Sequence, residues 1–275
     1  MVGHVEWVEF ARVEHMPRPG EIVHSLERWE EAAGGGAVAA VQLARLNGGA
    51  HFFTSLGDDE LGRRAREQLE GQGVAVHSAS VGEQRRAFTH VDGDGERTIT
   101  VLGAKLLPSG EHADLPWELL GRCQAVFFVS GDLAALRAAR RARVLVATAR
   151  ELTTLRRAGE QVDVLVGSGE DPGERFEPGE LDPPPQAVVT TSGSLGGWMQ
   201  PGGPFRAAPL PGPVEDAYGC GDCFAAGLTF GLGRGDALED AVALGARCGA
   251  AVLTGRGPYS AQLDAGALSR FDHIS

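Results

Sequence analysis

The sequence predicts a single α/β domain over residues 1–275, with helices on both faces of a mostly parallel central sheet and a small lid of β-strands. Two observations carry this prediction. Apolar runs rich in β-branched and aromatic residues alternate along the chain with stretches of helical periodicity, which is typical of a parallel sheet covered by helices. Two other regions alternate polar and apolar residues, as strands do when they bury only one face.

The elements of the main domain follow from this alternation. Strands are expected at 51–56, 125–130, 144–148, 162–167 and 187–191. Helices are expected at 36–46, 60–70, 133–141, 222–232 and 237–253. A glycine-rich break at 231–235 separates the last two helices, so the C-terminal third is predicted to be largely helical.

The lid is expected from two segments, approximately 5–28 and 86–102. In the second segment, two short alternating runs flank the sequence Asp-Gly-Asp-Gly at 92–95, which is typical of a hairpin turn. The pattern alone fits an edge extension of the main sheet equally well. An exposed lid edge would favour a homodimer formed through the lid strands, because unpaired strands invite pairing.

Composition narrows the class of partner. The chain has a net charge of −12, which opposes binding to nucleic acid or to an anionic membrane surface and favours a small-molecule ligand. No apolar stretch is long enough to cross a bilayer and no basic-then-apolar leader is present, so we expect a cytoplasmic protein. Lys105 is the only lysine and no glycine-rich phosphate loop precedes it, which disfavours Schiff-base and P-loop chemistry.

The four cysteines are too few and too scattered for a disulfide framework. Cys220 and Cys223 form a C-x-x-C at a predicted helix start, where a thiol pKa would be lowered, so a redox site is a minor alternative. Cys123 and Cys248 are isolated, and no second pair completes a zinc site.

The most informative stretch is 216–224, Asp-Ala-Tyr-Gly-Cys-Gly-Asp-Cys-Phe, which opens an apolar helical run. Gly219 and Gly221 flank Cys220 and allow close approach of a ligand to the free N–H groups of the first helical turn, which suits a phosphate. Asp222 lies beside this anion hole and can accept a proton from an attacking hydroxyl. The alternative is an acidic N-terminal cap after a glycine turn.

A second motif lies at 34–46, Gly-Gly-Gly-Ala-Val-Ala-Ala-Val-Gln-Leu-Ala-Arg-Leu, and Thr-Ser-Leu-Gly-Asp-Asp-Glu-Leu-Gly follows at 54–62. Together with 216–224, these residues resemble the PfkB carbohydrate kinases, a family with the ribokinase-like three-layer α/β/α fold, over essentially the whole chain. The resemblance implies ATP and Mg²⁺ as cofactors and, in some members, K⁺. It implies Asp222 as catalytic base, an anion hole of Gly219, Cys220 and Gly221, and a sugar bound close to Gly35 and Gly36.

The same resemblance implies an ATP site and a metal site. Residues expected along ATP and the cation loop are Thr191, Gly193, Gly196, Val252 and Gly257. Asp216 would hold a monovalent-cation loop. The acid that organises Mg²⁺ is expected at Glu170, with Glu174 behind it, because the family's Asn-x-x-Glu is altered here.

Departures from the family pattern fall on the substrate positions. Val8, after Glu6 on the first strand, occupies the place of an Asp that usually binds sugar hydroxyls. Val38 replaces an Asn and cannot form a side-chain hydrogen bond. Substrate contacts must therefore differ, and Arg97, Lys105 or Arg12 could meet an anionic substrate, although each is also typical of a solvated surface charge.

The function expected is transfer of the ATP γ-phosphoryl group to a hydroxyl, primary in the simplest case, of a sugar or similar small alcohol. Two alternatives stay open: a nucleoside or vitamin-precursor kinase, with Trp7 or Phe88 stacking on a base, and a catalytically weak ligand-binding or regulatory homologue. Residues 34–39 also fit the G-x-G-x-x-A motif of dinucleotide-binding oxidoreductases. That motif follows a buried apolar strand, whereas residues 27–31 are a charged run, so this class is disfavoured.

Overall fold

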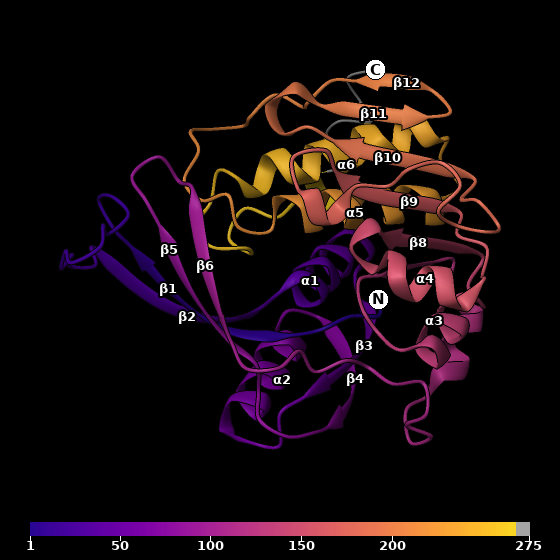
Figure 1. Cartoon of the computed structure of the whole chain (residues 1–275), viewed down its shortest axis with the longest axis horizontal. Coiled ribbons are helices and arrows are strands. Elements are labelled where there is room, and N and C mark those ends of the chain that lie inside the picture. Colours follow the sequence, from indigo (N-terminus) through magenta and orange to yellow (C-terminus); the bar gives the residue numbers. More distant parts are fainter. Residues whose placement is uncertain (268–275) are drawn as a thin grey trace.

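In the computed structural model, which describes residues 1–267, a mostly parallel sheet lies between two layers of helices (Figure 1). Its strands are β3 (Ala50–Leu56), β4 (Val74–Ser80), β7 (Ala125–Phe128), β8 (Val144–Thr148), β9 (Val164–Ser168), β10 (Ala187–Thr191), β11 (Gly197–Gln200) and β12 (Gly203–Phe205). They run in the order β12-β11-β10-β9-β8-β7, followed by the pair β3-β4, and only β11 and β12 are antiparallel to their neighbours. Val2 joins the two parts through parallel bridges to Phe53 and Phe128.

The helices are α1 (Gly35–Asn47), α2 (Glu60–Gly71), α3 (Leu133–Ala139), α4 (Leu152–Ala158), α5 (Cys220–Arg234) and α6 (Leu238–Val252). One hydrophobic core packs α1, α5 and α6 against one face of the sheet, and a second core packs α3 and α4 against the other. The predicted α/β/α architecture is confirmed, and all five predicted helices and all five predicted strands form within a few residues of the expected bounds.

A separate four-stranded sheet stands off the main body as the lid (Figure 1). Its order is β2-β1-β5-β6, built from β1 (Glu6–Arg12), β2 (Glu27–Ala33), β5 (Arg86–Val91) and β6 (Arg97–Leu102). The alternative of an edge extension of the main sheet is therefore wrong. β2 also carries the first lid segment beyond the expected residue 28, because its charged residues alternate with buried ones on a half-exposed sheet.

The lid has an inner and an outer face. Glu6, Val8 and Phe10 alternate with Trp7 and Glu9 along β1, and Phe10 contacts Tyr218, which immediately precedes the glycine turn before α5 (ring centroids 5.0 Å apart). The face that carries Glu6 and Phe10 is therefore the inner one, turned toward α5.

Several elements escaped prediction: β4, α4, β11 and β12. β4 reads Val-Ala-Val-His-Ser-Ala-Ser and has one parallel neighbour, β3, so only part of it is apolar. β11 and β12 are short antiparallel edge strands in a region rich in glycine and proline, which predicts loops. Within the described part of the chain, no helix has the length and apolar character needed to cross a membrane.

Candidate active site

The N-terminus of α5 has no side-chain cap. Gly219 precedes it in the left-handed conformation (φ 83°). The N–H groups of Cys220, Gly221 and Asp222 come before the backbone bond from Cys223 N–H to Gly219 O (2.9 Å). A Cβ atom added at Gly221 would meet no atom within 4 Å, so the side-chain position of Gly221 opens to free space. Free N–H groups and a helix dipole at such a place can bind an anion.

Asp222 lies against the start of α1. A Cβ atom at Gly35 would be 2.7 Å from Asp222 Oδ1, so only glycine permits this approach. At Gly36 an added Cβ would be 2.5 Å from the carbonyl oxygen of His4, and at Gly34 it would be 3.2 Å from Glu6 Cγ. We call Gly34, Gly35 and Gly36 the glycine track. Asp222 borders it at Gly35, and Glu6 with His4 borders it at Gly34 and Gly36.

Burial raises the pKa of Asp222 to about 6, against the positive charge of Arg97, which lowers it. Glu174 and Glu6 raise it further, whereas Arg150 lowers it. A carboxylate with such a pKa is ionised at neutral pH and still basic enough to accept a proton.

The lid reaches this site through Arg97. The guanidinium of Arg97 donates to the carbonyl oxygen of Ala217 (2.7 Å), in the loop that leads into α5. Arg97 faces inward because it pairs with Val91 on β5, whose side chain is fully buried. The tip of the lid hairpin therefore brings a positive charge to Asp222.

The carboxyl ends of β8 and β9 supply a charged wall. Arg150, just after β8, donates to Glu174 Oε1 (3.0 Å from Nε and 2.6 Å from Nη2), and Glu174 Oε2 accepts from Ser168 N (2.9 Å). Both oxygens of Glu174 are thus engaged. Glu170 lies on the same turn with its carboxylate close to Gly193, where an added Cβ would be 3.0 Å from Glu170 Oε1.

Of these two acids, Glu170 has the freer carboxylate. Mg²⁺ in phosphoryl-transfer sites uses one or two carboxylates, waters and phosphate oxygens. The surroundings of Glu170 fit that requirement, although no cluster of three or more metal-ligating side chains exists within residues 1–267.

Asp216 and Gly257 lie together, as the sequence predicts for a cation loop. Asp216 is fully buried and accepts hydrogen bonds from Tyr218 N (2.8 Å) and Gly257 N (3.0 Å). Glu31 is close by: an added Cβ at Gly257 would be 3.1 Å from Glu31 Oε2, which is buried and has no hydrogen-bond partner in the described chain. Burial raises the pKa of Glu31 to about 7, Arg256 lowers it and Asp216 raises it.

Three of the expected contact residues are buried in the core. The side chains of Val8, Val38 and Val252 are each 0% exposed, so none can touch a ligand in this structure. Val38 instead packs against the turn before α5, because its Cγ1 would be 2.8 Å from a Cβ at Gly219. Valine at these three positions therefore serves packing of the hydrophobic core.

The remaining expected ATP residues lie in one turn. β10 ends at Thr191, and η4 (Gly193–Leu195) follows and closes at Gly196, whose carbonyl accepts from Ser192 N (2.7 Å). Only glycine fits at position 196, since a Cβ would lie 2.1 Å from the carbonyl oxygen of Phe205.

The aromatic residues expected to stack on a base face away from the site. Trp7 is on the outer face of β1, under the guanidinium of Arg64 (4.3 Å to the ring centroid). Phe88 pairs with Glu9 and therefore shares that outer face. Neither ring is directed toward Asp222.

Cys220 and Cys223 do not form a redox pair in this structure. Both are free thiols, and burial raises the pKa of each instead of lowering it. Cys223 is fully buried, with its sulfur 3.3 Å from Gln262 Nε2. A reactive thiolate needs the opposite environment.

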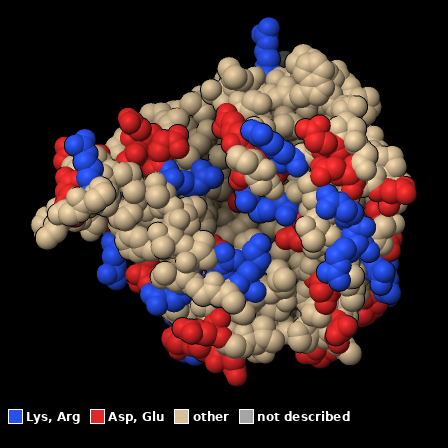
Figure 2. Space-filling model, in the orientation of Figure 1, with Lys and Arg blue, Asp and Glu red and all other residues tan. Residues whose placement is uncertain are grey.

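Sequence reasoning missed Arg85, Arg150, Glu31 and His4. Only Arg150 carried a signal, because it lies two residues after a predicted strand, in the region where ligand-binding side chains gather in parallel sheets. Figure 2 shows the face between lid and main body hollowed, with Lys and Arg side chains gathered around the hollow.

Comparison with known proteins identifies the family. The model of the pfkB family carbohydrate kinases matches residues 1–168 and 135–265, which together span almost the whole chain. The chain belongs to the pfkB family of carbohydrate kinases. It is therefore a phosphotransferase with an alcohol group as acceptor, a kinase of sugar-like substrates.

Individual pfkB relatives agree with this membership. The fructokinase of Salmonella typhimurium is 28% identical over 82% of this chain and 88% of its own length. The ATP-dependent ribose-1-phosphate kinase of Halopiger xanaduensis is 34% identical, over 37% of this chain and 34% of its own length. The ribokinase of Arabidopsis thaliana, solved with ribose and ATP, shares the fold at a TM-score of 0.76 with 20% identity, covering 100% of this chain and 98% of the other. The ribokinase-like fold predicted from the sequence is confirmed.

The glycine track can be tested at Gly35. In Gly35→Ala the added methyl group pushes Asp222 aside, and we expect kcat/KM for sugar phosphorylation to fall by about tenfold to a hundredfold. Gly71→Ala is the matched control, because a Cβ at Gly71 meets no atom within 4 Å. Steady-state kinetics and thermal unfolding of both variants check this. Equal activity of the two variants would contradict the assigned close approach.

Proposed function

We propose that this pfkB kinase transfers the γ-phosphoryl group of ATP to a hydroxyl, preferably primary, of a sugar or sugar-like alcohol, with Asp222 as general base. The observation that carries the proposal is the position of Asp222: it lies between the glycine track and the free N–H groups at the start of α5. A hydroxyl on the glycine track can lose its proton to Asp222 while the phosphoryl group lies over the anion hole. Positioning and charge stabilisation then supply most of the rate acceleration.

The other parts have assigned roles in the same proposal. Gly219, Cys220 and Gly221 bind the transferred phosphoryl group through backbone N–H groups. The turn of Thr191, Gly193 and Gly196 lies along ATP. Glu170 would hold Mg²⁺ mainly through waters, and the bound ion would supply charge neutralisation at the phosphates. The curated relatives support ATP as donor, since one of them is named an ATP-dependent kinase.

The two alternatives lose support. A nucleoside kinase would gain from an aromatic ring at the acceptor, but Trp7 and Phe88 are on the outer face of the lid. A catalytically weak homologue would have less need of a glycine at position 35, where the missing side chain lets Asp222 approach closely. Formation of a homodimer through the exposed edge of β6 stays a prediction.

The role of Asp222 is tested by Asp222→Asn. Removing the base while keeping the shape should lower kcat by roughly 10²–10⁴-fold and leave the affinity for ATP nearly unchanged. Asp114→Asn, at an exposed aspartate, is the control for a lost negative charge. Turnover is measured by coupled ADP release and ATP affinity by calorimetry. A variant with the turnover of the wild type would sink the assignment.

The pH profile provides a second test. Asp222 must be ionised to accept a proton, so kcat/KM should rise with pH through about 6 and level off above it. Arg97 lowers the pKa of Asp222, so Arg97→Gln should move this acid limb to higher pH. The profiles of the two proteins are compared between pH 4.5 and 9. An acid limb that stays in place would mean that another group titrates.

A monovalent cation is proposed at the loop of Asp216 and Gly257. The residues fit one, because two acids, Asp216 and Glu31, lie there and one buried oxygen of Glu31 lacks a partner within residues 1–267. K⁺ would offset this buried negative charge. At constant ionic strength, replacing choline by K⁺ should raise both activity and the thermal midpoint, and Glu31→Gln should weaken both responses. Indifference of wild-type protein to K⁺ would contradict the assignment.

A further inference from the structure

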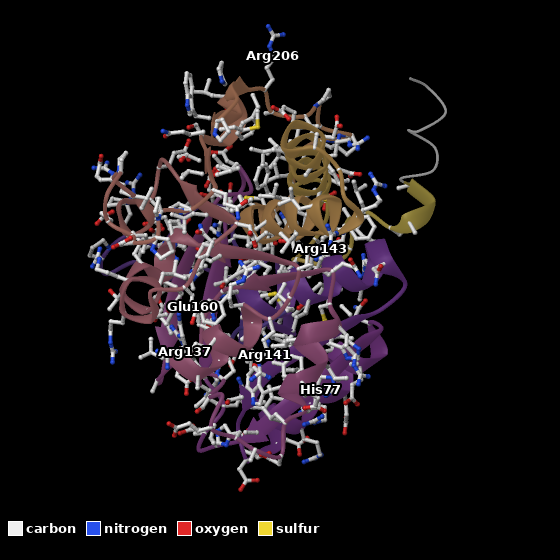
Figure 3. All side chains as sticks on the ribbon, turned by 90° about the vertical axis from the view of Figure 1, so that its right-hand side faces the viewer. His77, Arg137, Arg141, Arg143, Glu160 and Arg206 are labelled. Carbon is white, nitrogen blue, oxygen red and sulfur yellow. The ribbon has the colours of Figure 1, made fainter. Side chains whose placement is uncertain are left out.

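Tyr218 lies where the starts of α1 and α5 meet. It immediately precedes Gly219, the N-cap of α5, and its hydroxyl contacts Gly34, the N-cap of α1. The two helices are adjacent in Figure 1 and in the turned view of Figure 3. Tyr218 is only 5% exposed, so its side chain is enclosed between these helix starts and their surroundings. A large side chain at this point can act on both helix starts at once.

The hydroxyl of Tyr218 holds the first residue of the glycine track. Gly34 comes after Ala33, the last residue of the ladder between β1 and β2, so no strand partner fixes it. Its buried N–H donates to the Tyr218 hydroxyl (3.2 Å), which is its only acceptor within residues 1–267. The carbonyl oxygen of Gly34 accepts from Val38 N (3.0 Å) and so begins α1. Because a buried N–H without an acceptor is costly, this hydrogen bond determines where the track begins.

The main chain of Tyr218 is anchored separately. Its N–H donates to Asp216 Oδ1 (2.8 Å), and Asp216 Oδ2 accepts from Gly257 N (3.0 Å). Asp216 is fully buried. The phenol is therefore carried by a fixed turn, and the anion hole begins at the next residue along the chain.

The ring of Tyr218 also supports the lid. Phe10 of β1 meets it edge to face, with ring centroids 5.0 Å apart and planes at 74°. Trp29 of β2 stacks on the other side of this contact, with its ring 4.9 Å from that of Phe10 and nearly parallel to it. Both arrangements are favourable for aromatic pairs. The lid, the glycine track and the turn before α5 thus converge on one side chain.

The phenol has no part in proton transfer. Burial raises the pKa of Tyr218 well above its usual value, so the hydroxyl stays protonated and uncharged at neutral pH. The role open to Tyr218 is geometric. Gly34 is joined directly to Gly35, where an added Cβ would be 2.7 Å from Asp222 Oδ1. Any shift of Gly34 would therefore disturb the approach of Asp222 to the track.

We propose that Tyr218 is a positioning residue for phosphoryl transfer, whose hydroxyl holds the start of the glycine track in place against the anion hole. Its ring extends the same support to the lid through Phe10. This inference rests on the proposed function and adds to it a residue that touches neither ATP nor the acceptor. Such a residue can matter greatly, because a misplacement of about 1 Å can lower a rate about a hundredfold.

The test is Tyr218→Phe, which removes the hydroxyl and keeps the ring that contacts Phe10. Kinetics use whichever of fructose, ribose and adenosine is phosphorylated best. We expect kcat/KM for that acceptor to fall about ten- to a hundredfold, with KM for ATP changed less than about twofold because the turn before α5 stays anchored. ADP formation without acceptor should be retained, so its ratio to acceptor phosphorylation rises. A purely structural defect would lower both rates together.

Tyr259→Phe is the matched control. Tyr259 is 4% exposed, and its hydroxyl donates to the carbonyl oxygen of Ala32. Ala32 pairs with Trp7 inside the ladder between β1 and β2, so the strand stays in place without this hydroxyl. Both variants should have a lower thermal midpoint, but Tyr259→Phe should keep kcat/KM within about threefold of wild type. Equal losses of kcat/KM in the two variants would overturn the inference.

Hydrogen exchange in the wild-type protein tests the contact without any variant. The amide of Gly34 is buried and hydrogen-bonded, so it should exchange slowly when followed by nuclear magnetic resonance. Gly20, which is exposed in the loop between β1 and β2, provides the fast reference. Exchange of Gly34 as fast as that of Gly20 would contradict the inference.

The outcomes separate this inference from the proposed function. If Tyr218→Phe keeps the kcat/KM of the wild type while Asp222→Asn is inactive, the role of Tyr218 is overturned and the kinase mechanism stands. If Asp222→Asn keeps its turnover while Tyr218→Phe loses acceptor phosphorylation selectively, Asp222 is rejected as base and Tyr218 still positions the track.

Discussion

The site depends on the close approach of two helix starts. α1 begins on the glycine track and α5 begins after Gly219, and the two meet with no Cβ between them. At Gly35 the gap is filled by the carboxylate of Asp222, and at Gly219 by the methyl groups of Val38. Side chains at either glycine would force the helices apart and move Asp222 away from the start of α1.

Packing around this contact also sets its electrostatics. Burial beside the glycine track raises the pKa of the Asp222 carboxyl. The lid carries Arg97 at its tip and Arg85 at its base, and the charge of Arg97 lowers that pKa. A buried carboxylate near fixed positive charges suits proton transfer at neutral pH, because a low dielectric strengthens the electrostatic interactions in the site.

The substrate end departs from the family pattern in a way that packing explains. Val8 and Val38 stand where polar contacts are expected for this family, yet both are completely buried. The polar groups beside Gly34 are instead His4 and Glu6, and Glu6 pairs with Arg85.

The sequence by itself determined the layers of the fold and singled out a candidate reaction centre. Alternating apolar and helical runs report burial on both faces of a sheet, and the stretch 216–224 combines glycines with one acid at a helix start. Both signals are local, since they depend on residues near one another in the chain. The sequence motifs alone therefore single out Asp222, Gly219 and Gly35, and the folded chain places them together.

Only the tertiary structure decided which charges share the site. The sequence does not distinguish the cations near the site from ordinary surface charges; they are Arg85, Arg97, Lys105 and Arg150. Whether a charged side chain is buried or paired depends on the residues that pack against it in the folded chain. The fold pairs Arg85 with Glu6, and it pairs Arg150, just after β8, with Glu174. Likewise, Val8, Val38 and Val252 were expected at ligands and proved to be core, since exposure is a property of the assembled fold.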